Sequence, residues 1–155
     1  MHRFSGYALL FSFTFTLLFL FAALVLLPGC QGTRTSDRDL TLVTPSEGVE
    51  AVEGTRRAFG QRGQGGVWVD ARSESEFNQG HIPGAINLPI ERARQDHEIL
   101  RDYRTIIVYG NDFNSARANA LSKVLIELRH RDVRTLHGGL RAWKDAGHSV
   151  APDQQ

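Results

Sequence analysis

Cysteine is almost absent from this 155-residue chain, in which Cys30 is the only one. A single cysteine excludes a disulfide within one chain and a metal site built on cysteine thiolates. The nearly balanced formal charge of +1 indicates no nucleic-acid partner, which would require a basic surface. Because His97, His130, His137 and His148 share no close ligand spacing, the sequence predicts no metal site, and nothing in it indicates a cofactor.

Charge is also absent from residues 7–27, which follow the short basic start His2 and Arg3. This layout predicts a secretory signal, and an apolar run of about 20 residues is also long enough to cross a bilayer as a helix. Gly29 followed by Cys30 resembles a bacterial lipoprotein signal, in which the cysteine carries the lipid. An uncleaved anchor and a plain cleaved signal are the alternatives. Each of the three places most of the chain outside the cytoplasm.

The composition divides the chain into four segments. We expect a signal or apolar membrane segment at residues 1–29, a lipid-attached flexible tether at 30–39, a folded domain at 40–150 and a C-terminal tail at 151–155. The folded segment is long enough to form one hydrophobic core. The expected location is the bacterial cell envelope, with a membrane-anchored domain that faces the periplasm or the exterior.

Short apolar runs alternate with helix-start signals in the folded segment. Strands are expected at residues 40–43, 67–69, 86–88, 105–109 and 132–136, and helices after residues 44 and 73, at 91–101, after 115 and at 140–146. Two of the helix starts carry a capping box, Thr44 with Glu47 and Ser73 with Glu76. Strands and helices that alternate at this spacing predict a parallel, doubly wound α/β sheet.

The polar segment 110–115 follows the strand expected at 105–109 and precedes a helix. A loop between the carboxyl end of a strand and a helix N-terminus favours an anionic or thiolate group. Gly110, at the strand exit, has no side chain to supply such a group, and Asp112 adds a negative charge. Ser115 as a nucleophile would need a base held against it, and no histidine lies near it in sequence.

Three motifs stand in order along the chain: Val67-Trp68-Val69-Asp70-Ala71-Arg72 with Gly80-His81-Ile82-Pro83-Gly84-Ala85; Ile107-Val108-Tyr109; and Leu136-His137-Gly138-Gly139-Leu140-Arg141-Ala142-Trp143. Together they resemble the rhodanese (sulfurtransferase) domain family over about residues 40–150. The resemblance implies a five-stranded parallel sheet flanked by helices on both faces, with the active-site loop after the fourth strand. The signature residues in this chain are Asp70, Arg72, His81, Gly84, Gly138, Gly139 and Trp143.

In active members of this family, the loop opens with a cysteine that takes a sulfane sulfur from a donor such as thiosulfate and holds it as a persulfide. Gly110 occupies that place here, and Ser115 stands where many members have an arginine. Arg117 lies about 200° further round a helix than Ser115, so it need not face the loop. The resemblance therefore implies a catalytically inactive domain. A branch of the family that cleaves phosphate esters uses the same cysteine. The absence of that cysteine therefore also argues against phosphatase activity.

The function we expect is binding by the segment 110–115, with an unknown envelope protein or a small anion as the partner. Its members are Gly110, Asn111, Asp112, Phe113, Asn114 and Ser115. Phe113, an aromatic in a polar loop, is interpreted either as loop packing or as a contact residue. A sulfurtransferase that uses a thiol from Cys30 or from another protein is the alternative, and a spacer without a ligand is a third possibility.

The signature residues outside the loop have mainly structural interpretations. Asp70 and Arg72 are expected to order a strand-to-helix turn rather than to act as acid and base, since a carboxylate at a strand end accepts backbone N–H bonds. His81 is expected to hold the turn that follows it rather than to shuttle protons. Trp68 and Trp143 are expected to lie in the core or at its edge.

Overall fold

The computed structural model describes residues 35–59, 65–113 and 115–151, and therefore does not include the apolar stretch 7–27, Cys30 or Asn114. The described residues belong to one compact unit, which begins after residue 33. Within these ranges, no helix has the length and apolar character needed to cross a bilayer. The signal, the membrane anchor and the lipidation of Cys30 stay predictions.

Five parallel strands form one sheet in the order β1-β5-β4-β2-β3, which confirms the sheet predicted from the sequence. The strands are β1 (Thr41–Val43), β2 (Gly66–Asp70), β3 (Ile86–Asn87), β4 (Thr105–Tyr109) and β5 (Asp132–Leu136). All residues of β2 and β4 are buried, because both strands have neighbours on either side and helices above and below. The carboxyl end of the central strand β4 therefore opens at the middle of one edge of the domain.

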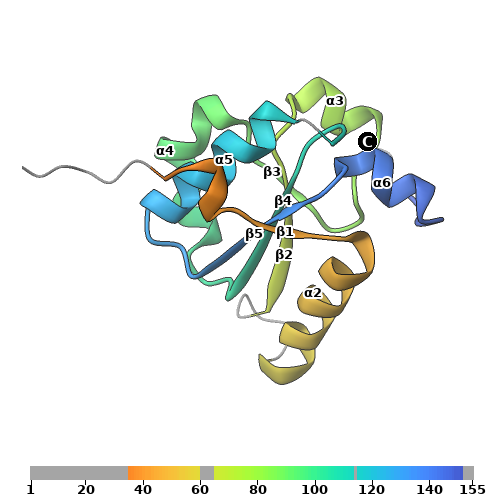
Figure 1. Cartoon of the computed structure of the whole chain (residues 1–155), viewed down its shortest axis with the longest axis horizontal. Coiled ribbons are helices and arrows are strands. Elements are labelled where there is room, and N and C mark those ends of the chain that lie inside the picture. The colour runs from red at the N-terminus through yellow and green to blue at the C-terminus, as the bar shows by residue number, and fades with distance from the viewer. Residues whose placement is uncertain (1–34, 60–64, 114, 152–155) are drawn as a thin grey trace, which may run out of the picture. The chain divides into compact units, whose positions relative to one another are not determined.

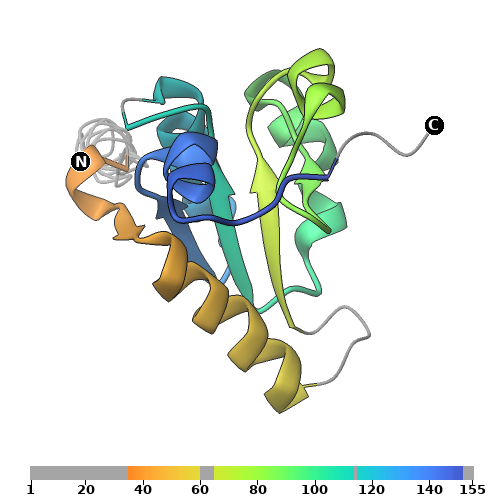
Figure 2. The same ribbon diagram turned by 90° about the vertical axis from the view of Figure 1, so that its right-hand side faces the viewer.

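Helices cover both faces of the sheet, as expected (Figures 1 and 2). On one face lie α2 (Pro45–Phe59) and α6 (Gly139–Asp145), and on the other α4 (Ala93–Asp96) and α5 (Ala116–Glu127). The short helix α3 (Glu74–Gln79) follows β2 at the edge where the strands end.

The side chains of the central strands β2 and β4 alternate between two hydrophobic cores, one under each helical layer. Ile106 and Val108 of β4 pack with residues of α5, whereas Ile107 and Tyr109 face the other core. In that second core the two tryptophans meet edge to face, with the ring centroids of Trp68 and Trp143 5.1 Å apart. This arrangement confirms the core positions that the sequence predicts for both tryptophans.

Both predicted capping boxes are present. The backbone N–H and the hydroxyl of Thr44 donate to the Glu47 carboxylate at 2.8 and 2.9 Å, and α2 begins at the following proline. Ser73 and Glu76 form the same reciprocal pair at the start of α3. Each box satisfies backbone donors that a helix N-terminus leaves unpaired, which explains why these boundaries could be read from the sequence.

The prediction of one continuous helix at 91–101 is wrong. The segment forms three short turns, η2 (Ile90–Arg92), α4 and η3 (His97–Leu100). Leu100 is fully buried while the adjacent Ile99 is 52% exposed, so the apolar residues do not form one continuous stripe. Without such a stripe, packing favours short turns over one regular helix.

The folded domain extends slightly beyond its expected ends. Ser36 caps a 3-10 turn, η1 (Asp37–Asp39), in the segment expected to be flexible, and Asp37 pairs with Lys123 of α5 at 2.6 Å. At the other end, Ala151 exchanges two backbone hydrogen bonds of 2.9 Å with His81. Asp37 and Ala151, which the sequence analysis places in the tether and the tail, thus contact the folded unit.

Candidate functional site

The loop after β4 is held by backbone groups of α6. The N–H groups of Leu140 and Arg141 donate to the carbonyls of Gly110 and Asn111 at 2.8 and 3.0 Å. These donors belong to the first turn of α6, where no intrahelical acceptor exists. Gly139 allows the contact, since a Cβ there would lie 2.5 Å from the Gly110 carbonyl oxygen.

The side chain of Ser115 fills the space in front of Gly110. A Cβ built on Gly110 would lie 1.7 Å from the Ser115 hydroxyl oxygen and 2.5 Å from the Ser115 Cβ. Gly110 is not among the residues with positive φ, so space and not backbone conformation excludes a side chain. Ser115 takes the N-cap position of α5, as expected, but its hydroxyl makes no capping hydrogen bond.

Phe113 is both packed and exposed. One edge of its ring meets His137 at a centroid distance of 5.0 Å, and a Cβ on Gly138 would lie 2.9 Å from the ring. Even so, 53% of the residue remains exposed. The two interpretations of Phe113, packing and contact, are therefore compatible. Asn114, the next loop residue, lies outside the described part of the chain.

Asp70 and Arg72 form a buried ion pair beneath the loop. The guanidinium donates to both carboxylate oxygens, with a shortest distance of 2.6 Å, and the Asp70 carboxylate also accepts the Arg72 backbone N–H at 2.9 Å. Arg72 further donates to the Gly80 carbonyl at 2.7 Å. The pair thus ties the end of β2 to the end of α3, which agrees with the turn-ordering role predicted from the sequence.

Tyr109 closes the same network from β4. Its hydroxyl accepts the backbone N–H of Ile82 at 3.1 Å, and Arg72 lies 5.9 Å from the centre of its ring. Burial, followed by the negative charge of Asp70, raises the pKa of Tyr109 far above its usual value. The phenol therefore stays protonated at all ordinary pH values and serves as a fixed hydrogen-bonding group.

Glu76 connects α3, the loop and α5. Its carboxylate accepts hydrogen bonds from the Asn111 amide at 2.8 Å and from Arg117 at 2.6 Å, besides those of the Ser73 cap. The hydrogen bond from Asn111, followed by those from Ser73 and Arg117, lowers the pKa of Glu76 to about 2. The sequence analysis recognised Glu76 only as a capping residue, because no local signal reports a contact across 35 residues.

This network predicts a measurable pH dependence of stability. The folded pKa of Glu76 is depressed, so its contribution to stability is present above about pH 4.5 and is lost as the pH falls toward 2. We expect Glu76→Gln to be less stable than wild type at pH 6, with a difference that shrinks as the pH decreases. Urea unfolding from pH 6 to pH 2.5 measures it. Glu74→Gln, on the same helix, is the control, and a pH-independent difference for Glu76→Gln would contradict the prediction.

The remaining signature residues stabilise the neighbouring turns. The His81 ring stacks on Phe77 at 3.8 Å, and its Nδ1 lies 3.0 Å from the Phe77 carbonyl oxygen. Gly84 adopts φ 76°, a left-handed conformation that favours glycine. The Trp143 indole N–H donates to the carbonyl of Ser149 at 2.9 Å. None of these side chains touches the loop through a contact that the structure shows.

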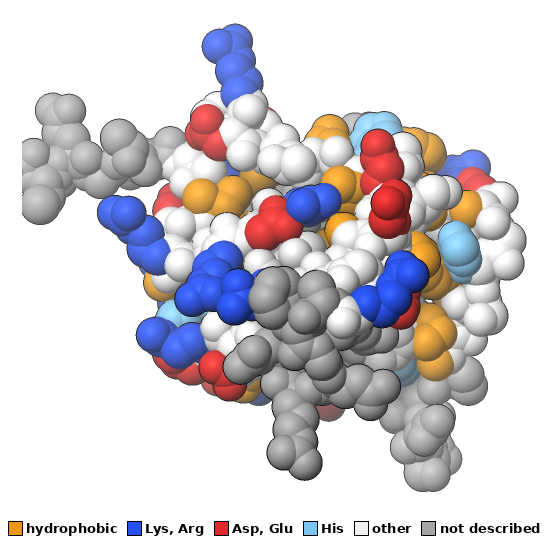
Figure 3. Space-filling model, turned by 90° about the horizontal axis from the view of Figure 1, so that it is seen from below, with side chains coloured by type: hydrophobic (Ala, Val, Ile, Leu, Met, Phe, Trp, Pro, Cys, Tyr) orange, Lys and Arg blue, Asp and Glu red, His pale blue; other side chains and the backbone are white. Residues whose placement is uncertain are grey.

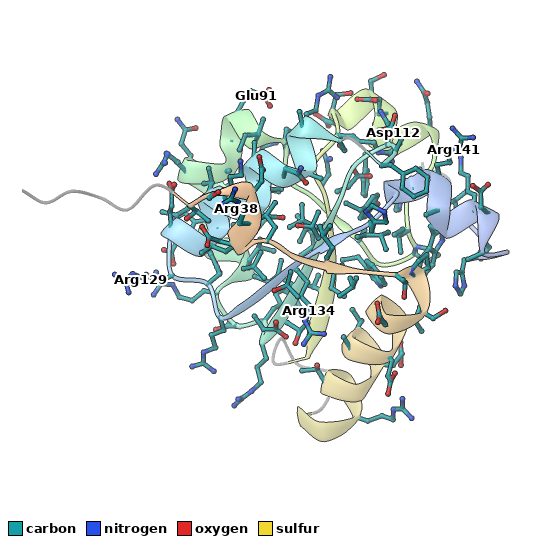
Figure 4. The ribbon with its side chains drawn as sticks, viewed as in Figure 1. Arg38, Glu91, Asp112, Arg129, Arg134 and Arg141 are labelled. Carbon is teal, nitrogen blue, oxygen red and sulfur yellow. The ribbon has the colours of Figure 1, made fainter. Side chains whose placement is uncertain are left out.

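A depression of about 260 Å³ lies beside the loop. Figure 4 labels one of its lining residues, Arg141, near Asp112 of the loop. It is lined by Arg72, Asn111, Leu140, Arg141, Lys144 and Asp145. Arg72 is paired with Asp70, and Arg141 lies 3.9 Å from Asp145, so Lys144 leaves the lining with a small net positive charge. Such a charge favours an anion over a cation. The described residues contain no thiol and no group of three metal-ligating side chains.

The comparisons with known proteins agree with this architecture. The sequence profile of the rhodanese-like domain matches residues 57–146, more than half of the chain. The structure superimposes on a rhodanese-related protein from Thermoplasma volcanium with a TM-score of 0.58 and 23% identity, over 73% of this chain and 99% of that one. It superimposes on a thiosulfate sulfurtransferase from Pseudomonas aeruginosa with the same TM-score and 25% identity, over 74% of this chain and 20% of that one. This chain belongs to the rhodanese-like domain family.

Curated relatives are similar over part of their length. The protein YqhL of Bacillus subtilis is 29% identical over 75 residues, which cover 48% of this chain and 58% of YqhL. A putative thiosulfate sulfurtransferase of Mycobacterium tuberculosis, SseB, is 30% identical over 100 residues, which cover 50% of this chain and 35% of SseB. The chain thus spans little more than half of the first relative and about a third of the second. It shares a domain with sulfurtransferases.

Proposed function

We propose that this chain is a rhodanese-like domain without sulfurtransferase activity, held at a membrane of the bacterial cell envelope by its N-terminal segment and acting through binding. The observation that carries the proposal is the packing of Ser115 against Gly110. In the family, the first loop residue supplies the sulfur-carrying thiol. Here that residue has no side chain, and the hydroxyl of Ser115 occupies the space where a Cβ would stand.

The loop surface supports binding. Phe113 offers an exposed aromatic ring on a loop whose backbone is fixed by α6 and whose Asn111 is fixed by Glu76. A rigid, exposed aromatic is a typical anchor of a protein interface, because little conformational entropy is lost when it is buried. The cationic depression beside it would suit a partner with an acidic group, or a small anion alone.

A sulfurtransferase that uses a thiol from Cys30 or from another protein is the second candidate, favoured by the similarity to SseB. Neither of these thiols belongs to the loop, and positioning supplies much of the catalytic effect of a nucleophile. The first proposal is therefore preferred.

Recovery of a crosslinked envelope partner tests the binding role. We expect the full chain, crosslinked in intact bacterial cells, to recover a protein whose yield falls about tenfold in Phe113→Ala, as for an interface hot spot. Ile99→Ala is the matched control, because Ile99 is equally exposed, at 52%, but belongs to η3 and not to the loop. Equal recovery by wild type and Phe113→Ala would contradict binding through the loop.

A further inference from the structure

A second basic pocket, of about 230 Å³, lies at the C-terminal end of α5 and shares no residue with the loop or its depression. It is lined by His97, Arg101, Leu128, Arg129, His130 and Arg131. Figure 3 shows Lys and Arg side chains gathered beside a histidine on the left of the molecule, the side on which Figure 4 places Arg129.

Arg129 stands in a backbone position that usually belongs to glycine. It has φ 65°, the only positive value among the described non-glycine residues. The α5 terminus is a Schellman motif, in which the Arg129 N–H donates to Ile126 and the His130 N–H donates to Leu125. An arginine here carries a conformational cost that glycine would avoid. Residues with a strained backbone conformation are found mainly at functional sites, where the side chain takes part in binding or catalysis.

The guanidinium groups of this pocket are only partly neutralised. Arg101 is paired with Glu98, whereas Arg129 and Arg131 make no ion pair with a described residue. Both are exposed and line the same small volume. The arrangement leaves a net positive charge with two planar donor groups available to a ligand.

The two histidines fix the spacing between the walls of the pocket. His97 Nδ1 lies 3.2 Å from His130 Nε2, and this hydrogen bond joins the η3 turn to the loop between α5 and β5. Burial, followed by the nearby His97, lowers the pKa of His130, which favours the neutral form of this ring. No local pattern in the sequence predicts this contact, because the two histidines are 33 positions apart.

We propose that this pocket binds a phosphate group, with Arg129 and Arg131 as its main donors. Arginine forks match phosphate oxygens in pairs, and the hydrogen bonds are charge-assisted. The volume exceeds that of one water, roughly 30 Å³, severalfold and leaves room for the group that carries the phosphate. Free phosphate compounds and lipid headgroups share this chemistry. The competing interpretation is that the arginines only complement the negative end of the α5 dipole.

Isothermal titration of the full chain in uncharged detergent micelles, at fixed ionic strength, tests the proposal. The probes are inorganic phosphate and the short-chain lipid dihexanoylphosphatidylglycerol. We expect one of them to bind, with at least a tenfold loss of affinity in Arg129→Gln/Arg131→Gln. The control, Arg38→Gln/Arg57→Gln, also removes two exposed arginines, and neither of them lines the pocket. Preference for phosphate or for the lipid identifies the source of the bound group.

Arg129→Gly separates the two interpretations without risk of misfolding. If Arg129 is kept for its ligand, glycine should raise the unfolding temperature by a few degrees and weaken binding at the same time. Unchanged affinity in Arg129→Gly would overturn the proposal. So would binding of neither probe by wild type, or an equal loss of affinity in the control.

Discussion

Changing Gly110 to cysteine and Ser115 to glycine together is expected to give this chain a thiosulfate-to-cyanide sulfur transfer, which on the proposed function wild type does not carry out. The new thiol would stand at the carboxyl end of β4, where the N-terminus of α5 stabilises negative charge and lowers the pKa of a thiolate. A gain on the order of 10²-fold or more over wild type follows, because a covalent route opens that was closed before.

The single Gly110→Cys variant should gain little. Its Cβ would meet the Ser115 hydroxyl oxygen at 1.7 Å, so the loop or Ser115 must move before the thiol can take its place. Ser115→Gly is the matched control, because glycine is tolerated at an N-cap with a loss of only about a few tenths of a kcal/mol. The test is the rate of thiocyanate formation by wild type, by the two single variants and by the double variant. Activity in wild type that disappears in Cys30→Ser would contradict the proposal and identify the thiol.

Asp70→Ala is expected to destabilise the domain by about 3–5 kcal/mol, the typical cost of leaving one partner of a buried ion pair uncompensated. Asp70 is fully buried and Arg72 is 5% exposed, so the guanidinium could not recover its hydration without opening the end of β2. Asp70→Leu/Arg72→Met should regain much of the loss, because it removes both charges and fills a similar volume. Urea denaturation of each variant gives the free energy of unfolding.

The exposed ion pair of Arg92 and Asp96 serves as the control for the buried pair of Asp70 and Arg72. Its shortest distance, 2.6 Å, equals that of the buried pair, yet 61% of the Arg92 side chain is exposed. Arg92→Ala should cost about 1 kcal/mol or less, since solvent screens exposed ion pairs. If Asp70→Ala cost no more than Arg92→Ala, the buried pair would not be a main support of the turn.

Local signals explain why most of the fold could be predicted. The capping boxes at Thr44 and Ser73 mark their own helix starts, and short runs of apolar, β-branched residues such as 105–109 are typical of a buried strand. The turns at 90–100 could not be predicted, because the burial of Leu100 beside the exposed Ile99 depends on packing against the sheet.

The candidate site was predictable in its position but not in its contacts. A polar loop after a buried strand identifies the place where a ligand or nucleophile would be held. The contact between Ser115 and Gly110 depends on the path of the loop, and the bond between Glu76 and Asn111 joins separate elements. No local sequence pattern predicts either contact, and none predicts the hydrogen bond between His97 and His130.

The packing of Ser115 against Gly110 also has an evolutionary consequence. On the proposed function, a return to sulfur transfer requires two substitutions, and the cysteine alone would strain the loop, since its Cβ would overlap the Ser115 side chain. Ser115→Gly alone would bring no thiol and hence no selective gain. On the proposed function, neither single substitution is favoured over the present pair, so a return to sulfur transfer by single steps is disfavoured.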